Sequence, residues 1–186
     1  MSKRVCPWWI GYILASPLRR LFSNPRRLLE PYVREGMKVL EPGPGMGFFT
    51  LELARMVGPS GRVIAVDIQD RMLSSLKRRA SRAGLLDRIE IRLVPPNSMQ
   101  LENLNGKIDF TLAFAMVHEM PAVAPFFQQV AAASRPGAQI LLAEPAGHVN
   151  IAEFEEELKA AESAGFKLSV RPPVGGSHAA LLTKET

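Results

Sequence analysis

The sequence predicts an α/β domain in which a mainly parallel sheet is covered by helices on both faces. From residue 36 onward, short apolar segments alternate with longer amphipathic ones, a pattern typical of repeated strand–helix units. The segment 108–115 is predominantly apolar, as expected for a strand buried on both faces. The last two apolar segments are joined only by Pro-Pro-Val-Gly-Gly, so they cannot both run parallel to the others, because no crossover helix fits between them.

Glycine- and proline-rich breaks set the limits of the expected elements. The expected strands are Met37–Glu41, Arg62–Asp67, Ile89–Val94, Ile108–Ala115, Ala138–Glu144, Lys167–Arg171 and His178–Thr183. The expected helices are Phe48–Val57, Gln69–Ala83, Ala122–Ser134 and Ile151–Ala164. Glycines close several of these helices, and Arg135-Pro136-Gly137 is expected to form a turn before the fifth strand.

The composition fits a single globular domain. The chain has 186 residues, of which 47% are hydrophobic and 22% are charged. Its one cysteine, Cys6, allows neither an internal disulfide nor a cysteine-based zinc site, and it suits a reducing compartment. No apolar run approaches the ~20 residues that span a bilayer. We therefore expect a cytoplasmic protein without a transmembrane segment.

The positive charge lies in an N-terminal arm, residues 1–35, ahead of the α/β domain at 36–186. The arm contains seven basic and two acidic residues, which accounts for the whole net charge of +5. Ser16-Pro17 and Asn24-Pro25 each predict a helix start, because a capping residue precedes a proline suited to the first turn. Such an arm could contact an anionic substrate, RNA or a membrane surface, or simply be a solvated helix face. Its aromatic residues could close as a lid over a site or merely anchor the arm; they are Trp8, Trp9, Tyr12, Phe22 and Tyr32.

A glycine-rich turn follows the first expected strand and points to a bound nucleoside. The strand ends at Glu41, glycines stand at positions 43, 45 and 47, and Asp67 closes the second strand. Glycine lets the backbone bend sharply and lets a ligand approach closely, because no Cβ intervenes. At the carboxyl edge of a parallel sheet, this arrangement predicts a pocket for a nucleoside-bearing cofactor.

The spacing of the glycines argues against a dinucleotide. The pattern Gly-x-Gly-x-x-Gly, starting at Gly43, would need glycine where Phe48 stands, and the Gly-Lys-Ser/Thr of a phosphate loop is absent. Glu41 would repel a phosphate and would favour a cationic group. A nicotinamide-dependent oxidoreductase is therefore disfavoured.

Together these features resemble a known family. Glu41-x-Gly43-x-Gly45-x-Gly47 resembles the first motif of the class I S-adenosylmethionine-dependent methyltransferases, and the resemblance extends over residues 36–184. It implies a Rossmann-like three-layer sandwich with a seven-stranded, mostly parallel sheet and an antiparallel C-terminal strand. It also implies S-adenosyl-L-methionine as cofactor, with Asp67 accepting the ribose hydroxyls. The cofactor-binding residues that it implies are Glu41, Gly43, Gly45, Gly47, Asp67, Ile68, Asn97, Ser98 and Phe114.

Two histidines at the same sheet edge are candidate catalytic residues. His118 follows the fourth expected strand and His148 follows the fifth. Because ligands bind beyond the carboxyl ends of such strands, either histidine could take a proton from an oxygen or nitrogen acceptor. Alternatively, each one only caps or packs. With Glu119 and Glu144 they could also hold a metal, but the spacing does not require one, and we expect none.

Several methyl acceptors are disfavoured by the same resemblance. Members that methylate exocyclic amines usually carry Asp/Asn-Pro-Pro-Tyr after the fourth strand, where this chain has Phe114-Ala115-Met116-Val117. Cytosine C5 methylation uses a Pro-Cys nucleophile and arsenic methylation uses several cysteines, and the chain provides neither. We expect a small-molecule acceptor. An RNA methyltransferase that grips phosphates with its basic arm, or a non-catalytic cofactor-binding module, remains an open alternative.

Overall fold

The computed structural model describes residues 24–185. The helix start expected at Ser16-Pro17 lies outside these residues, as do Cys6 and all the arm aromatics except Tyr32. Within the described part of the chain, no helix is both long and apolar enough to cross a membrane.

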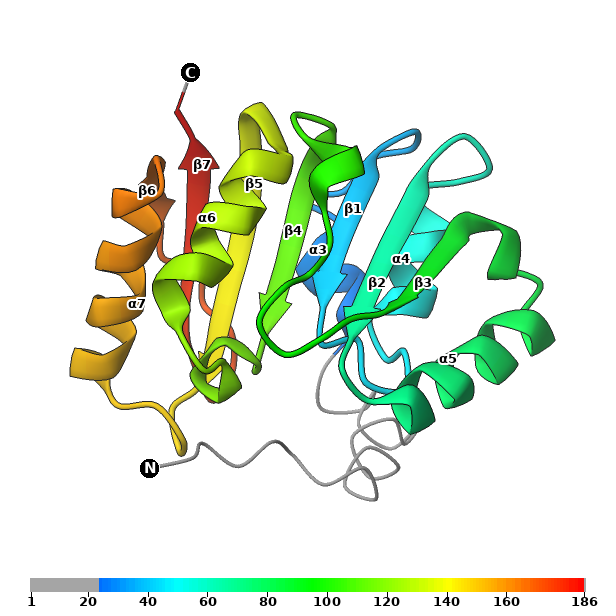
Figure 1. Ribbon diagram of the computed structural model, residues 1–186, viewed down its shortest axis with the longest axis horizontal. Coiled ribbons are helices and arrows are strands. Elements are labelled where there is room, and N and C mark those ends of the chain that lie inside the picture. The colour runs from blue at the N-terminus through cyan, green and yellow to red at the C-terminus, as the bar shows by residue number, and fades with distance from the viewer. Residues whose placement is uncertain (1–23, 186) are drawn as a thin grey trace. The chain divides into compact units, whose positions relative to one another are not determined.

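Seven strands form the sheet, in the order β3-β2-β1-β4-β5-β7-β6 (Figure 1). Parallel pairs join β1 to β2, β2 to β3 and β4 to β5, whereas β7 runs antiparallel to both β5 and β6. The predicted fold, a mostly parallel α/β sheet with an antiparallel C-terminal strand, is therefore confirmed. The described residues divide into two compact units, 24–95 and 96–185.

The first unit contains three parallel strands and their helices. Its elements are α3 (Pro25–Leu29), β1 (Lys38–Pro42), α4 (Thr50–Met56), β2 (Arg62–Asp67), α5 (Asp70–Arg82), the 3-10 turn η1 (Leu86–Arg88) and β3 (Ile89–Leu93). Asn24 caps α3, because its side chain accepts the backbone N–H groups of Arg26 and Arg27, and Pro25 opens the helix as predicted. Apart from Lys38 and Arg62, every residue of β1 and β2 is buried, as parallel strands covered on both faces require.

The second unit contains the other four strands. Its elements are η2 (Glu102–Leu104), β4 (Ile108–Phe114), η3 (Val117–Glu119), α6 (Val123–Ala133), β5 (Ser134–Pro145), α7 (Ile151–Ser163), β6 (Phe166–Val170) and β7 (Ser177–Lys184). Helices α6 and α7 lie side by side (Figure 1). A capping box between Asn150 and Glu153 starts α7 directly after the loop that carries His148. This cap fixes where that loop ends.

Two predicted limits are wrong. The helix expected over 48–57 begins only at Thr50, because residues 45–49 form turns. Arg135-Pro136-Gly137 does not separate a helix from a strand but lies inside β5, which begins at Ser134. The register there shifts from Ile108 opposite Ser134 to Phe110 opposite Gln139, so the three residues belong to an irregular bulge.

Candidate functional site

In the first unit, the glycine turn begins beside the end of β2. Pro42 pairs with Val66, and the Gly43 N–H donates to the Val66 carbonyl at 2.9 Å. Asp67 is the next residue after Val66, so the start of the turn and the second carboxylate meet at the carboxyl end of two parallel strands. This is the position that the sequence predicted for the pocket.

Glu41 brings a buried negative group to the same place. Its side chain is 3% exposed, and within the described residues no hydrogen-bond partner reaches its Oε2 atom. The pKa of Glu41 is raised to about 7, chiefly by burial; the Thr50 hydroxyl opposes the rise and the Asp67 carboxylate adds to it. A buried carboxylate with an unsatisfied oxygen is costly on its own, so it is suited to receive a cation or a hydrogen-bond donor.

Gly47 has a structural reason to be glycine. Its φ is +86°, and a Cβ at this position would collide with Leu76 Cδ1 on α5. At Gly45, φ is +54° but a Cβ would meet open space. The turn is also held from α5 by Arg79, whose Nη1 donates to the Met46 carbonyl at 2.5 Å. Gly47 therefore lets the turn pack on α5, whereas the Cβ position of Gly45 faces space that a ligand could use.

Asp67 and Ile68 form the other side of this region. Asp67 is 9% exposed, and its Oδ1 accepts the Gln69 N–H at 2.9 Å in the turn before α5. Ile68 is 39% exposed, so its apolar side chain is accessible next to Asp67. A carboxylate beside an exposed apolar surface suits a ribose with its attached base, because one group binds hydroxyls and the other binds a flat apolar ring.

In the second unit, His118 is tied to a buried carboxylate. Its Nδ1 pairs with Oε2 of Glu144, a residue at the end of β5 that is 0% exposed. Glu144 Oε1 accepts the backbone N–H groups of Met116 at 3.1 Å and Val117 at 2.7 Å. Ala115 makes this turn with φ of +55°, a conformation that non-glycine residues rarely adopt.

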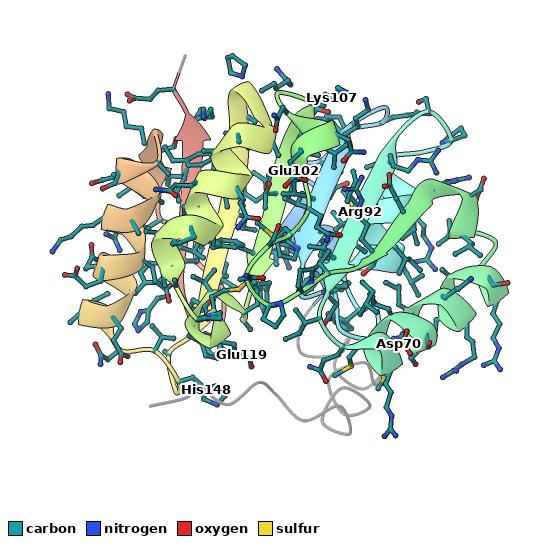
Figure 2. All side chains as sticks on the ribbon, in the orientation of Figure 1. Asp70, Arg92, Glu102, Lys107, Glu119 and His148 are labelled. Carbon is teal, nitrogen blue, oxygen red and sulfur yellow. The ribbon has the colours of Figure 1, made fainter. Side chains whose placement is uncertain are left out.

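His148 and Glu119 complete the surroundings of His118. The rings of His118 and His148 meet edge to face, with centroids 5.7 Å apart. Glu119 Oε1 lies 4.0 Å from His118 Nε2. Figure 2 shows Glu119 and His148 at the same end of the second unit. The hydrogen bond to Glu144 raises the pKa of His118 above 6.5, and burial opposes the rise. The structure thus brings both predicted histidines together.

The remaining predicted site residues lie in the second unit near its start. Asn97 is exposed in the loop after β3, and Phe114 is half-buried at the end of β4. Ser98 Oγ accepts the Gln100 N–H at 3.1 Å. Their part in cofactor binding stays a prediction. Among residues 24–185, no three His, Cys, Asp or Glu side chains gather as a metal-binding group would need.

Sequence reasoning missed three contributors to these regions. They are the link from Glu144 to His118, the left-handed Ala115 and the bond from Arg79 to the glycine turn. One signal for the first was available, because β5 ends in Glu144-Pro145 just as β1 ends in Glu41-Pro42. No local signal marks the other two, because both depend on contacts or backbone geometry that only the folded chain defines.

A sheet of this order, with a glycine turn after its first strand, is that of an α/β methyltransferase. The chain belongs to the methyltransferase domain family, since the sequence profile of that family matches residues 33–171. This confirms the predicted family, together with its enzyme class and its S-adenosylmethionine cofactor.

Similar proteins carry several names. The ubiquinone/menaquinone biosynthesis C-methyltransferase UbiE of Cronobacter sakazakii is 29% identical over 143 residues, which are 75% of this chain and 53% of that protein. The catechol O-methyltransferase of Mycobacterium tuberculosis is 34% identical over 108 residues, covering 58% of this chain and 48% of that protein. The ribosomal protein L11 methyltransferase of Pelotomaculum thermopropionicum is 33% identical over 115 residues, covering 62% and 34%.

Among solved structures, a SAM-dependent methyltransferase from Aquifex aeolicus superposes with a TM-score of 0.84 at 24% identity, covering 96% of this chain and 98% of that one. This likeness shows the fold. The chain spans between about a fifth and about a half of the length of the curated relatives that it matches.

Proposed function

We propose that this protein transfers a methyl group from S-adenosylmethionine to a small-molecule acceptor, with His118 as the group that takes the acceptor's proton. The observation that carries the proposal is the contact between His118 and the buried Glu144 at the ends of β4 and β5. A histidine held by a carboxylate is a general base with one nitrogen still available. His148, 5.7 Å away between ring centroids, would line the same acceptor region.

The residues of the first unit fit the cofactor. S-adenosylmethionine supplies a methyl group on a positively charged sulfur, together with an amino-acid group and an adenosine. The buried Glu41, with its unsatisfied Oε2, favours a positive charge or an N–H donor nearby. The turn at Gly43 and Gly45 offers backbone groups at close range, Asp67 offers acceptors for hydroxyls and Ile68 offers an apolar surface. Asn97, Ser98 and Phe114 belong to this proposal as further cofactor contacts.

A small acceptor is supported by what the sequence carries after β4. Phe114-Ala115-Met116-Val117 stands where amine-methylating members usually have Asp/Asn-Pro-Pro-Tyr. Two of the similar proteins are named for a quinone-pathway C-methyltransferase and a catechol O-methyltransferase, although a third is named for ribosomal protein L11. A base at His118 would assist methyl transfer to an acceptor that must lose a proton, such as a hydroxyl or an acidic carbon.

The proposal also assigns roles to the chain outside the site. Residues 1–35 would act as an arm or lid on the domain at 36–186, and the single cysteine supports a cytoplasmic location. RNA is the alternative acceptor, and the seven basic residues of the arm are what favour it.

The experiment combines cofactor binding with an acceptor panel. Calorimetric titration should detect binding of S-adenosylmethionine and S-adenosylhomocysteine but no binding of NAD. Transfer of tritiated methyl is then measured to catechol, a quinol and a small amine, and to RNA and ribosomal protein L11 as macromolecular acceptors. Turnover with a small molecule supports the proposal. Turnover restricted to RNA or protein would overturn it, and tight cofactor binding without any transfer would favour a non-catalytic module.

A further inference from the structure

Behind the proposed base lies a fully buried carboxylate. Glu144 is 0% exposed and holds three groups at once: the N–H of Met116, the N–H of Val117 and the His118 ring. Both backbone groups reach Oε1, which leaves Oε2 for the imidazole alone. A carboxylate only accepts hydrogen bonds, so the proton on the imidazole must sit on Nδ1.

From this geometry we infer that Glu144 is a positioning residue that fixes His118 as the Nδ1–H tautomer and so presents Nε2 as the proton acceptor. The inference rests on the proposed function. During transfer, the acceptor atom forms its new bond to the methyl carbon, the electron pair of the broken bond stays on the donor sulfur, and the acceptor's proton passes to Nε2. The charge that then forms on the ring is stabilised by Glu144.

The backbone strengthens this arrangement. Ala115 adopts φ of +55°, a left-handed conformation that is unfavourable for a non-glycine residue. The same residue donates its N–H to the Ala143 carbonyl at 2.7 Å, next to Glu144. This strained bend directs the N–H groups of the next two residues onto the carboxylate. The bend therefore helps to fix Glu144, and Glu144 holds His118, whose side chain is 20% exposed.

The charged groups near His118 set the pH range in which its ring can act as a base. Glu119 lies 4.0 Å from Nε2, Glu157 on α7 also favours the charged ring, and His148 meets the ring edge to face. His178 stands opposite Glu144 in the β5–β7 register. With three glutamates nearby, the pKa of His118 is raised above 6.5, so Nε2 is available as a base only at pH values above that raised pKa.

The test is a nitrogen-15 NMR titration of the histidine side chains in the full-length protein, with S-adenosylhomocysteine present and absent. The described chain holds His118, His148 and His178, so each signal can be assigned by a single His→Gln variant. Above its pKa, His118 should show a protonated Nδ1 and an unprotonated Nε2. An Nε2–H tautomer in the wild-type protein would overturn the inference, whether or not any acceptor is ever found.

The decisive variant is Glu144→Gln. The two backbone N–H groups require an oxygen, so they should turn the new amide with its NH₂ toward Nδ1, which forces the proton of His118 onto Nε2. The NMR tautomer should invert, and the maximal rate with the best panel acceptor should fall roughly 10²–10⁴-fold with an unchanged Kd for S-adenosylmethionine. The matched control, Glu119→Gln, should lower the pKa of His118 and keep the tautomer.

The outcomes separate this inference from the proposed function. If no acceptor in the panel is methylated, the proposed function fails even when the tautomer is as expected. If Glu144→Gln keeps the Nδ1–H tautomer, or inverts it without loss of rate, the positioning role of Glu144 is wrong. Should the variant not fold, the wild-type tautomer alone still decides.

Discussion

Two buried glutamates close strands in this protein, and they are in opposite states. Glu41 is the penultimate residue of β1 in the first unit and Glu144 that of β5 in the second, and each strand ends at the proline that follows. Glu41 has an oxygen that no described residue satisfies, whereas Glu144 is saturated by two backbone N–H groups and one imidazole. The same residue type therefore serves two purposes: an unsatisfied carboxylate is prepared for a ligand, and a satisfied one orients a neighbouring side chain.

The largest effect is expected from removing the satisfied carboxylate. Glu144→Ala leaves two backbone N–H groups and the His118 ring without their acceptor in the core, so it should lower the free energy of unfolding by about 3–5 kcal/mol. Urea denaturation at pH 7.5 measures this. The matched variant Glu41→Ala removes a carboxylate that is not saturated, and its loss should be clearly smaller. Equal losses would contradict the comparison.

The contribution of Glu41 to the stability of the ligand-free protein is expected to depend on pH. Its pKa is raised from 4.5 to about 7, so the folded, ligand-free protein keeps a proton that the unfolded chain releases. Stability from this group is full below pH 4.5 and is lost as pH rises through about 7, on the order of 3 kcal/mol in all. Glu41→Gln should therefore be more stable than wild type at pH 8 and similar at pH 5. Urea denaturation at both pH values checks this.

The affinity for S-adenosylmethionine should have the opposite pH dependence at Glu41, because binding favours the ionised carboxylate. S-adenosylmethionine carries positive charge, so its affinity for the wild type should increase as pH rises through about 7, with release of a proton. The affinity of Glu41→Gln should be at least tenfold weaker at pH 8 and independent of pH. Calorimetry in two buffers of different ionisation enthalpy counts the proton. A variant that is both more stable and equally tight would show that Glu41 does not face the ligand.

Within the glycine turn, two substitutions separate packing from ligand contact. Gly47→Ala combines a φ of +86° with a collision against Leu76, and should cost about 2 kcal/mol of stability. Gly45→Ala has only the backbone cost, about 1 kcal/mol, because its Cβ would meet open space. Thermal denaturation ranks the stabilities of the two variants, and calorimetry measures their affinities for the cofactor. Relative to the stability that each variant loses, Gly45→Ala should lose more cofactor affinity than Gly47→Ala. The reverse ranking would mean that the turn packs differently.

The order of strands and helices was predictable because it depends on local signals. Apolar runs ended by Gly84 and Gly165 gave the limits of two helices to within one residue, and Asn24-Pro25 gave the start of α3. Asp67 was placed at the end of β2 by simple alternation of strand and turn. Local rules sufficed here because each element is defined by a few consecutive residues.

The contacts inside the site were not predictable in this way. His118 and Glu144 are 26 residues apart in sequence and meet only because β4 and β5 are neighbours. Gly47 was interpreted as a ligand contact, yet its nearest constraint is a leucine from α5. Ala115 carries no sign in the sequence of its left-handed backbone, which brings its own N–H to Ala143 and those of the next two residues to Glu144. Such features depend on tertiary packing, and one-dimensional patterns do not encode it.

A last comparison tests whether Asp67 binds the ligand together with Glu41 or only shapes a turn. Asp67→Ala should weaken S-adenosylmethionine binding about tenfold or more, because hydrogen bonds from the ribose to a charged acceptor are lost. Asp67→Asn is the matched control, since its amide oxygen can still accept the Gln69 N–H that Asp67 Oδ1 accepts at 2.9 Å. If Asp67 only shapes the turn, the Asp67→Asn variant should have both the stability and the cofactor affinity of the wild type. If the ribose matters, Asn restores stability in thermal denaturation while affinity in calorimetry stays reduced, because an amide presents one acceptor oxygen where a carboxylate presents two. Unchanged affinity in Asp67→Ala would remove Asp67 from the cofactor site and leave Glu41 as the one acidic group there with a proposed ligand.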